Sequence, residues 1–227
     1  MENNQNKLNN PVWYSLKEAH KMFSIEMKNI CFYHPDFCLF GGFSDEINIA
    51  KGIDQYAELI NNFYVVGDKP PYNETLRLNK ELVCNQMVLE KFIKAEEDNS
   101  IVRLARGNKD NLLKLVSLVQ PGYFRSRTSE LGAYFGIYKN EKLVAVTGER
   151  MKMDTYTEVS AVVTHPNYMG QGYAKKLVTH TANKIFSENK IPYLHVADTN
   201  AAAIHLYEKL GFKTRRKISF WNFVVKI

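Results

Sequence analysis

The feature that most constrains this chain is the run 162–174, VVTHPNYMGQGYA, where a strand, a glycine turn and a helix start follow one another. Alternating apolar residues predict the strand over 157–164, and apolar residues on one face predict the helix over 172–189. A helix start presents unpaired N–H groups at the positive end of its dipole, and glycines let a ligand approach the main chain closely. The run is therefore typical of a phosphate-binding turn.

Two well-known glycine-rich loops do not fit this turn. A Walker A loop is excluded because no Gly-Lys-Ser/Thr sequence follows the glycines. A Rossmann fingerprint is excluded because its third glycine is missing. A tight turn with a purely structural purpose stays open on this pattern alone.

The second half of the chain alternates strands and helices. We expect a helix over 110–119, a hairpin of strands over 132–138 and 142–149, a strand over 193–197, a helix over 200–210 that ends at Gly211, and one or two strands over 213–227. This order predicts an α/β or α+β domain with a mixed sheet.

The first half has a different pattern. We expect an amphipathic helix over 13–32 that ends at His34-Pro35-Asp36, a helix over 47–60, a strand over 63–66, a turn or linker over 69–71 and extended chain over 82–89. A boundary at 98–100 would divide the 227 residues into parts 1–100 and 101–227. The first part contains no equivalent of the glycine turn.

A second informative stretch is 200–212, NAAAIHLYEKLGF, one strand downstream of the turn. By itself it predicts an ordinary helix that Asn200 caps, with Tyr207 on the same face as Ala203 and Leu210. Together, the two stretches resemble the acetyl-CoA motifs of the GNAT superfamily of N-acetyltransferases, in the same order and with a helix and a strand between them. The resemblance covers about residues 130–227.

The resemblance implies a GNAT fold, with a mixed, mostly antiparallel central sheet flanked by helices. It also implies acetyl-CoA as the acyl donor, bound by Val162, Val163, Thr164, Met169, Gly170, Gln171, Gly172, Tyr173, Ala174, Lys175, Asn200, Ala203 and Tyr207. Met169 stands where the family usually has Gln or Arg, at a position that contacts the pyrophosphate largely through its main chain.

The stretch 124–150 is similar to a two-part GNAT subgroup akin to glycine N-acyltransferases, in which the first half is a degenerate partner domain. This similarity implies that residues 1–100 form a degenerate α/β half. We expect that half to shape the acceptor site without binding CoA.

The same resemblance implies the catalytic residues. Tyr207 would protonate the departing CoA thiolate, although a core tyrosine is the alternative. Glu158 would be the base that deprotonates the amine, with Glu149 as the second candidate. The alternatives are a solvent-facing strand glutamate for Glu158 and an ion pair with Arg150 or Arg127 for Glu149. The acceptor would be a small-molecule amine or a peptide N-terminus.

Charge and cysteine usage bear on partners. The net charge is +6, and its dense group at Lys213, Arg215, Arg216 and Lys217 fits either a charged strand edge or attraction of an anionic ligand. Because the charge is otherwise dispersed, we expect no nucleic-acid partner. The three cysteines predict buried, reduced thiols rather than a metal pair.

No metal is expected from the histidine spacings, and no membrane span or signal peptide from the apolar runs, so we expect a cytoplasmic location. A rival to the acetyltransferase is a binding module that senses acyl-CoA without turnover. An RNA-associated or ribosome-associated protein is a third class, which salt-dependent RNA binding would support.

Overall fold

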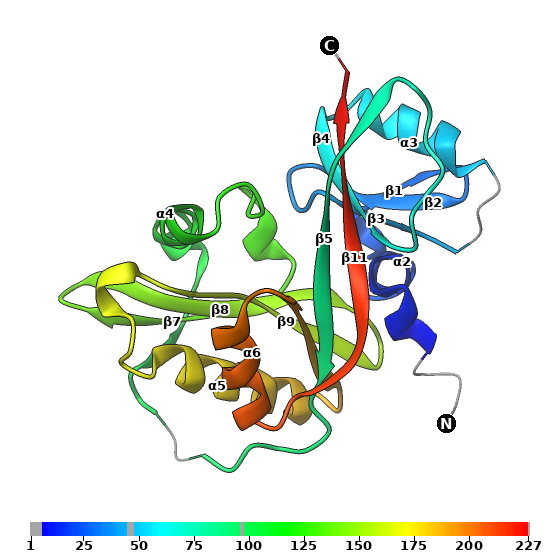
Figure 1. Ribbon diagram of the computed structural model, residues 1–227. Coiled ribbons are helices and arrows are strands. Elements are labelled where there is room, and N and C mark those ends of the chain that lie inside the picture. The colour runs from blue at the N-terminus through cyan, green and yellow to red at the C-terminus, as the bar shows by residue number, and fades with distance from the viewer. Residues whose placement is uncertain (1–5, 45–47, 96–97, 227) are drawn as a thin grey trace.

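The structure is a computed structural model that describes residues 6–44, 48–95 and 98–226. Its strands are β1 Ser24–Met27, β2 Ile30–Tyr33, β3 Phe40–Phe43, β4 Asn62–Gly67, β5 Leu76–Val88, β6 Ile101–Arg103, β7 Tyr134–Lys139, β8 Lys142–Lys152, β9 Tyr156–Thr164, β10 Ile191–Ala197 and β11 Lys213–Val225. In the described residues they form one 11-stranded sheet in the order β1-β2-β3-β4-β11-β5-β10-β9-β8-β7-β6 (Figure 1).

The helices are α2 Pro11–Lys17, α3 Ile49–Ala57, α4 Lys109–Val119, α5 Tyr173–Ser187 and α6 Ala201–Lys209, with short 3₁₀ turns between some elements. Figure 1 shows α4 on one side of β7–β9 and α5 with α6 on the other. The packing agrees: Leu112 of α4 clusters with Tyr134, whereas Leu177 of α5 clusters with the next residue of the same strand, Phe135. Successive strand residues face opposite sides, so the two helices cover opposite faces.

The sheet does not divide at residue 100. Strand β5, from the first half of the chain, lies between β10 and β11 of the second half and pairs antiparallel with both. Figure 1 shows β5 and β11 running side by side through the length of the molecule. The two-part division stays a prediction, and any such parts share one continuous set of main-chain hydrogen bonds.

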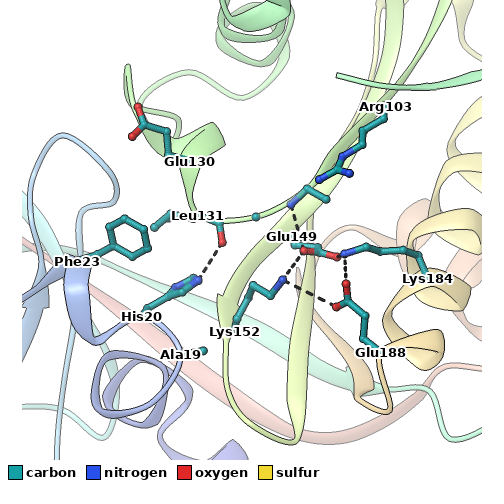
Figure 2. A pocket seen from close by; sticks show the side chains of 12 residues that line it. Ala19, His20, Phe23, Arg103, Glu130, Leu131, Glu149, Lys152, Lys184 and Glu188 are labelled. Atoms are coloured by element: carbon teal, nitrogen blue, oxygen red, sulfur yellow. Dashed lines mark hydrogen bonds and ion pairs between the residues drawn. The ribbon is translucent and has the colours of Figure 1, made fainter. Parts of the chain in front are cut away.

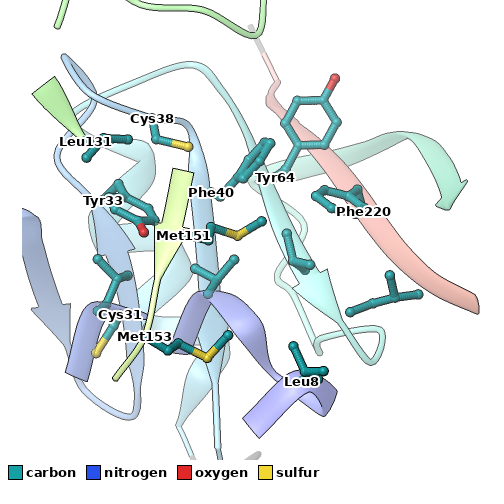
Figure 3. Packing of buried hydrophobic residues seen from close by; sticks show 14 of the residues in the cluster. Leu8, Cys31, Tyr33, Cys38, Phe40, Tyr64, Leu131, Met151, Met153 and Phe220 are labelled. Atoms are coloured by element: carbon teal, nitrogen blue, oxygen red, sulfur yellow. The ribbon is translucent and has the colours of Figure 1, made fainter. Parts of the chain in front are cut away.

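The largest buried cluster also joins the two halves. Tyr33, Cys38 and Phe40 pack with Met151 and Phe220 in one apolar cluster (Figure 3). All three cysteines of the chain are buried and free, as the sequence predicted.

One predicted element is wrong: residues 13–32 do not form a single helix. Helix α2 begins with Pro11, whose fixed φ suits a first helical turn, and ends at Lys17. The later residues form the β1–β2 hairpin, in which Met27 opposes Ile30 and Lys28 turns the chain at φ 55°. Each residue of β2 is buried, and such a continuous buried run is a strand pattern that the 3.6-residue periodicity concealed.

The other predicted helices and strands are present with shifted ends, and residues 69–71, predicted as a turn or linker, have no regular structure. The predicted hairpin is formed by β7 and β8, and its turn residues Asn140 and Glu141 both have positive φ, which matches the right-handed twist of the strands. The predicted helix over 47–60 is α3, although residue 47 lies outside the described residues. The C-terminal stretch forms the single strand β11.

Strands β9 and β10 are parallel and separate after a short paired stretch. Their last pair is Glu158 with Tyr193, after which β10 continues beside β5 alone. A bulge at Ala161, with φ 50°, interrupts the pairing of β9 with β8 at about the same level. The edge of β9 over 160–164 therefore has no partner on β10, and we call this region the splay.

No helix in the described ranges is long and apolar enough to cross a membrane.

Candidate functional site

The predicted glycine turn follows β9 as a 3₁₀ turn, Pro166–Tyr168, whose first residue is preceded by His165 acting as its cap. Gly170 and Gly172 then adopt φ of +76° and +75°, in the left-handed region that side chains disfavour. A Cβ at either glycine would meet no atom within 4 Å, so open space lies beside the main chain. Met169 lies on that exposed surface, with 69% of the residue accessible.

Helix α5 starts directly after this turn. Gly172 is its N-terminal cap and contributes no side chain, and the first helical hydrogen bond there runs from the Lys176 N–H to the Gly172 carbonyl. The N–H groups of Tyr173, Ala174 and Lys175 belong to the first turn and have no acceptor within the helix. The turn thus combines open space, positive φ and free donors, which together fit an anionic group such as a pyrophosphate.

Two neighbouring side chains have defined positions. The Tyr173 hydroxyl donates to Gln171 Oε1 at 2.6 Å, which fixes the side chain at the centre of the turn. Lys175 is exposed and lines a cavity of about 950 Å³, whose other walls include α5 and the residues Phe92, Ala95, Asp98, Asn99 and Ile101. This lysine can therefore reach a ligand that extends outward from the turn.

The second predicted stretch forms α6. Asn200 accepts a hydrogen bond from the Ala203 N–H at 3.2 Å and so caps the helix, as its type and position indicate. Tyr207 is 6% exposed and packs in the same cluster as Val159 of β9 and Leu194 of β10. The glycine turn and the stretch 200–212 therefore both lie next to β9 and β10, the two strands that form the splay.

The Tyr207 hydroxyl has no hydrogen-bond partner in the part of the chain that the structure describes. Burial raises the pKa of Tyr207 to about 12, so the hydroxyl keeps its proton at neutral pH. The proton is thus present for the donor role that the sequence predicts, but a hydroxyl of raised pKa gives it up less readily than a free tyrosine does.

Glu158 is bound on several sides. The carboxylate is 1% exposed, and Arg150 donates to it twice, from Nε at 2.7 Å and from Nη2 at 3.0 Å. His195 Nδ1 lies 2.8 Å from the same carboxylate. Burial alone would raise the pKa of this carboxyl group, but Arg150 and His195 outweigh it and lower the pKa to about 2. The alternative of a solvent-facing strand glutamate is therefore wrong for Glu158.

These contacts bear on the predicted base role of Glu158. A carboxylate of such low pKa, with a guanidinium on both oxygens, has little tendency to take a proton from an amine. An acceptor amine would have to displace Arg150 or reach the carboxylate through water. The base role of Glu158 therefore stays a prediction, and it requires one of these two routes to the carboxylate.

A row of polar side chains continues from Glu158 across the sheet. Gln86 of β5 donates from Nε2 to the Leu8 carbonyl at 2.8 Å and accepts on Oε1 from Arg215 at 3.0 Å, which fixes its amide orientation. The same Nε2 lies 3.1 Å from His195 Nε2, which must then accept. His195 Nδ1 therefore carries the ring proton and donates it to Glu158.

The sequence does not reveal this row, and for His195 it suggests only a pocket or packing role. The members of the row lie on four neighbouring strands, of which β8 and β9 are consecutive in the chain while β10 and β5 come from distant segments. Register between strands decides which of them meet, and no local pattern reveals that register.

Glu149, the second predicted base, faces the other side of the sheet. It opposes Val159, whereas Arg150 opposes Glu158, and neighbouring positions of a strand point in opposite directions. The structure does not bring Glu149 and Glu158 together. The predicted alternative of an ion pair is correct in kind, but its partners are lysines rather than arginines.

Figure 2 shows those partners. Lys152 Nζ donates to Glu149 at 2.8 Å, Lys184 Nζ donates to its other oxygen, and the Ala133 N–H donates at 3.1 Å. Burial would raise the pKa of Glu149, yet the two lysines lower it overall. Like Glu158, it is held as a carboxylate.

Glu149 forms part of the wall of a cavity of about 430 Å³, shown in Figure 2. The cavity lies near the C-terminal end of α5, where it includes Lys184 and Glu188, and so at the opposite end of that helix from the glycine turn. It also includes His20, whose Nε2 is 2.9 Å from the Leu131 carbonyl. This cavity is separate from the splay.

Metal ligands are not grouped in the described segments: no set of three or more His, Cys, Asp or Glu side chains there could hold an ion.

The glycine turn, the splay and the capped helix α6 together define a class of protein. The chain is similar to a solved structure of a GNAT-family acetyltransferase from Novosphingobium aromaticivorans, with 26% identity and a TM-score of 0.88. The match covers 97% of this chain and 99% of the other. The chain therefore has the GNAT N-acetyltransferase fold.

Further comparisons agree with this fold. Residues 134–221 match the family model described as FR47-like protein. A GCN5-related N-acetyltransferase from Kribbella flavida matches with a TM-score of 0.62 at 12% identity, covering 95% of this chain and 94% of the other. A tandem GNAT protein of the clavulanic acid biosynthesis pathway matches with a TM-score of 0.53 at 12% identity, covering 85% and 77%. No curated protein matches by sequence.

These relatives support acyl transfer in general, and the tandem relative fits a two-part arrangement.

Proposed function

We propose that this protein transfers the acetyl group of acetyl-CoA to an amine by direct attack, with a small-molecule amine or a peptide N-terminus as acceptor. The observation that carries the proposal is the meeting of three features at one place. The glycine turn, the unpaired edge of β9 and the Tyr207 hydroxyl lie on elements that border the splay.

The residues that would hold acetyl-CoA follow from this geometry. The pyrophosphate would lie on the free N–H groups around Gly172, and the pantetheine arm would pair with the open edge of β9 at Val162, Val163 and Thr164 as an added strand does. When bound, acetyl-CoA supplies the acyl group as a thioester. Met169 would take part through its main chain.

The proposed chemistry needs no covalent enzyme intermediate. The amine nitrogen forms the C–N bond, the C–S bond breaks, and one proton moves from the amine to the sulfur. Tyr207 would donate its proton to the thiolate and regain one from solvent. Deprotonation of the amine is assigned to Glu158, under the condition that the acceptor displaces Arg150 or reaches the carboxylate through water.

The first half of the chain would shape the acceptor site, as in the glycine N-acyltransferase-like subgroup. Two contacts support this role. The Phe40 ring of β3 lies 4.7 Å from the Arg150 guanidinium, and Gln86 of β5 contacts His195. The residues around Glu158 on this face of the sheet therefore come from both proposed parts.

A second candidate function is a module that binds acyl-CoA without turnover. The specific observation in its favour is the ion pair of Glu158 with Arg150, because a carboxylate already paired with a guanidinium is a poor base for an acceptor amine.

One experiment separates the two functions. Calorimetry measures acetyl-CoA binding, and release of CoA is then followed over a panel of alkylamines, amino acids and peptides. Binding with CoA release supports the acetyltransferase, and binding without release across the panel supports the sensor. Absence of acetyl-CoA binding would reject both.

A further inference from the structure

Among the described residues, the fully buried polar side chains on the Glu158 face of the splay have partners within the protein, with one exception. Arg150, Glu158 and His195 satisfy one another. The hydroxyl of Tyr134, which is 2% exposed, has no hydrogen-bond partner among the described residues. A buried hydroxyl that gives up its bonds to water without a replacement destabilises the fold, so a phenylalanine would be the more stable choice at this position.

The tyrosine side chain is directed across the sheet. Tyr134 of β7 opposes Gly148 of β8, which in turn opposes Ser160 of β9. A Cβ on Gly148 would lie 2.3 to 2.6 Å from three ring carbons of Tyr134. The ring therefore lies directly over Gly148, and only a residue without a side chain permits this path.

The register fixes the face on which the ring lies. Gly148 and Arg150 are two apart on β8, as Glu158 and Ser160 are on β9, so all four positions address the same side of the sheet. The hydroxyl is thus carried from β7 toward the bulged part of β9, where the strands separate. Tyr207 approaches the same strands from the α5 side.

The charged surroundings agree with this placement. Burial raises the pKa of the Tyr134 hydroxyl, while Arg150 acts in the opposite direction and Cys38 and Glu158 reinforce the rise. The hydroxyl therefore keeps its proton at neutral pH, next to the ion pair. A protonated, unpartnered hydroxyl at this point can donate a hydrogen bond to an acceptor atom of a ligand.

We propose that the Tyr134 hydroxyl binds substrate, by donating a hydrogen bond to a carbonyl oxygen held at the splay. The proposal rests on the acetyl-transfer function proposed above. Such an oxygen has two sources: the thioester carbonyl of acetyl-CoA, or a carbonyl or carboxylate beside the amine of an amino acid or peptide acceptor. A simple alkylamine lacks the second.

Tyr134→Phe tests the proposal, because it removes one oxygen and leaves the ring in place. Thermal unfolding should show an unchanged or higher Tm, since the variant loses an unsatisfied buried group. The kcat/KM should nevertheless fall about 10-fold, the loss expected for one neutral hydrogen bond to substrate. This combination separates substrate binding from a structural role, which would lower Tm and activity together.

The kinetic constants distinguish the two sources of the oxygen. If the oxygen belongs to the thioester, the variant lowers kcat with alkylamine and peptide acceptors alike. If it belongs to the acceptor, the variant raises KM for amino acids and peptides and leaves alkylamines unaffected.

Thr181→Val is the matched control. The Thr181 hydroxyl is also buried without a partner among the described residues, but it lies on α5, which covers the other face of the sheet. We expect an unchanged or higher Tm and unchanged kinetics. Gly148→Ala supplies an independent variant, because its methyl group must displace the Tyr134 ring and should reproduce the activity loss.

Unchanged kcat/KM in Tyr134→Phe for every acceptor overturns the proposal, as does a clear fall in its Tm, which would reveal a partner within the protein. Failure of the wild-type protein to bind acetyl-CoA would reject the proposed function itself. That result is recognised without any Tyr134 variant.

Discussion

Arg150 and Glu158 face each other across β8 and β9 and form a two-pronged ion pair at the last level where β9 still pairs with β10. The pair is buried: 14% of the arginine side chain and 1% of the glutamate side chain are exposed. A charge pair in such a place joins β8 and β9 through their side chains at the start of the splay. Its removal is therefore informative about both stability and mechanism.

Glu158→Gln should lower the free energy of unfolding by about 3–5 kcal/mol, because it leaves the Arg150 charge buried without a counter-ion. The double variant Arg150→Met with Glu158→Gln removes both charges and should lose clearly less. Urea unfolding of the two variants measures the difference. Equal losses would mean that the ion pair is not what the single substitution disturbs.

The double variant also tests the base role. If it folds and releases CoA at the wild-type rate at pH 7, Glu158 is not needed as a base. If turnover is lost while calorimetry shows unchanged acetyl-CoA affinity, the base role is supported.

Tyr207→Phe should lower kcat by up to about 100-fold with little effect on the KM for acetyl-CoA, because only proton donation is lost. Burial, which raises the pKa of Tyr207 to about 12, keeps the proton available. Steady-state kinetics under conditions where chemistry limits the rate measure the effect. An unchanged kcat would make Tyr207 a packing residue.

Gly172→Asp should weaken acetyl-CoA binding by roughly 10-fold or more, since it places a negative charge against the pyrophosphate. The left-handed φ of +75° adds backbone strain that is independent of charge. Gly172→Asn is the control, because asparagine tolerates this conformation and carries no charge. Calorimetry that finds equal affinity for the aspartate variant, the asparagine variant and the wild type would displace the pyrophosphate from this turn.

His20 should make stability depend on pH between about 4 and 6.5. Its side chain is buried, and burial lowers the pKa of His20 from 6.5 to about 4. Between these pH values His20 binds a proton in the unfolded chain but not in the folded chain. The free energy of unfolding therefore falls as the pH drops through this window, by up to about 3 kcal/mol. Urea unfolding at several pH values measures the slope, and His20→Gln should flatten it.

Residues 101–227 alone should not fold cooperatively. Without β5, strands β10 and β11 lose the strand that both of them pair with. Circular dichroism on heating should show no sharp transition for this fragment. The control is the full chain cleaved once after Ala95, which keeps every strand and should still unfold cooperatively. A sharply melting fragment would support two independent domains.

The local elements of the second half were predictable because each depends on neighbouring residues. The glycine turn needs Gly170 and Gly172 for their φ, and the cap of α6 needs only Asn200 and the helix that follows it. The helix predicted over 13–32 failed for the opposite reason. Its apolar spacing suits a helix, yet the chain gains more by pairing β1 with β2 and adding both to the sheet.

The sequence by itself determined the GNAT fold and the turn that would take the pyrophosphate, since both can be recognised from the contiguous stretches 162–174 and 200–212. Tertiary structure alone decided that Glu158 pairs with Arg150, that Glu149 faces the other side, that β5 crosses into the second half and that Tyr134 reaches over Gly148. The physical reason for the side-chain positions is strand register, whereas the position of β5 is a matter of strand order in the sheet. A shift of one residue would turn each of these side chains to the other face, and register is set by the packing of the whole sheet.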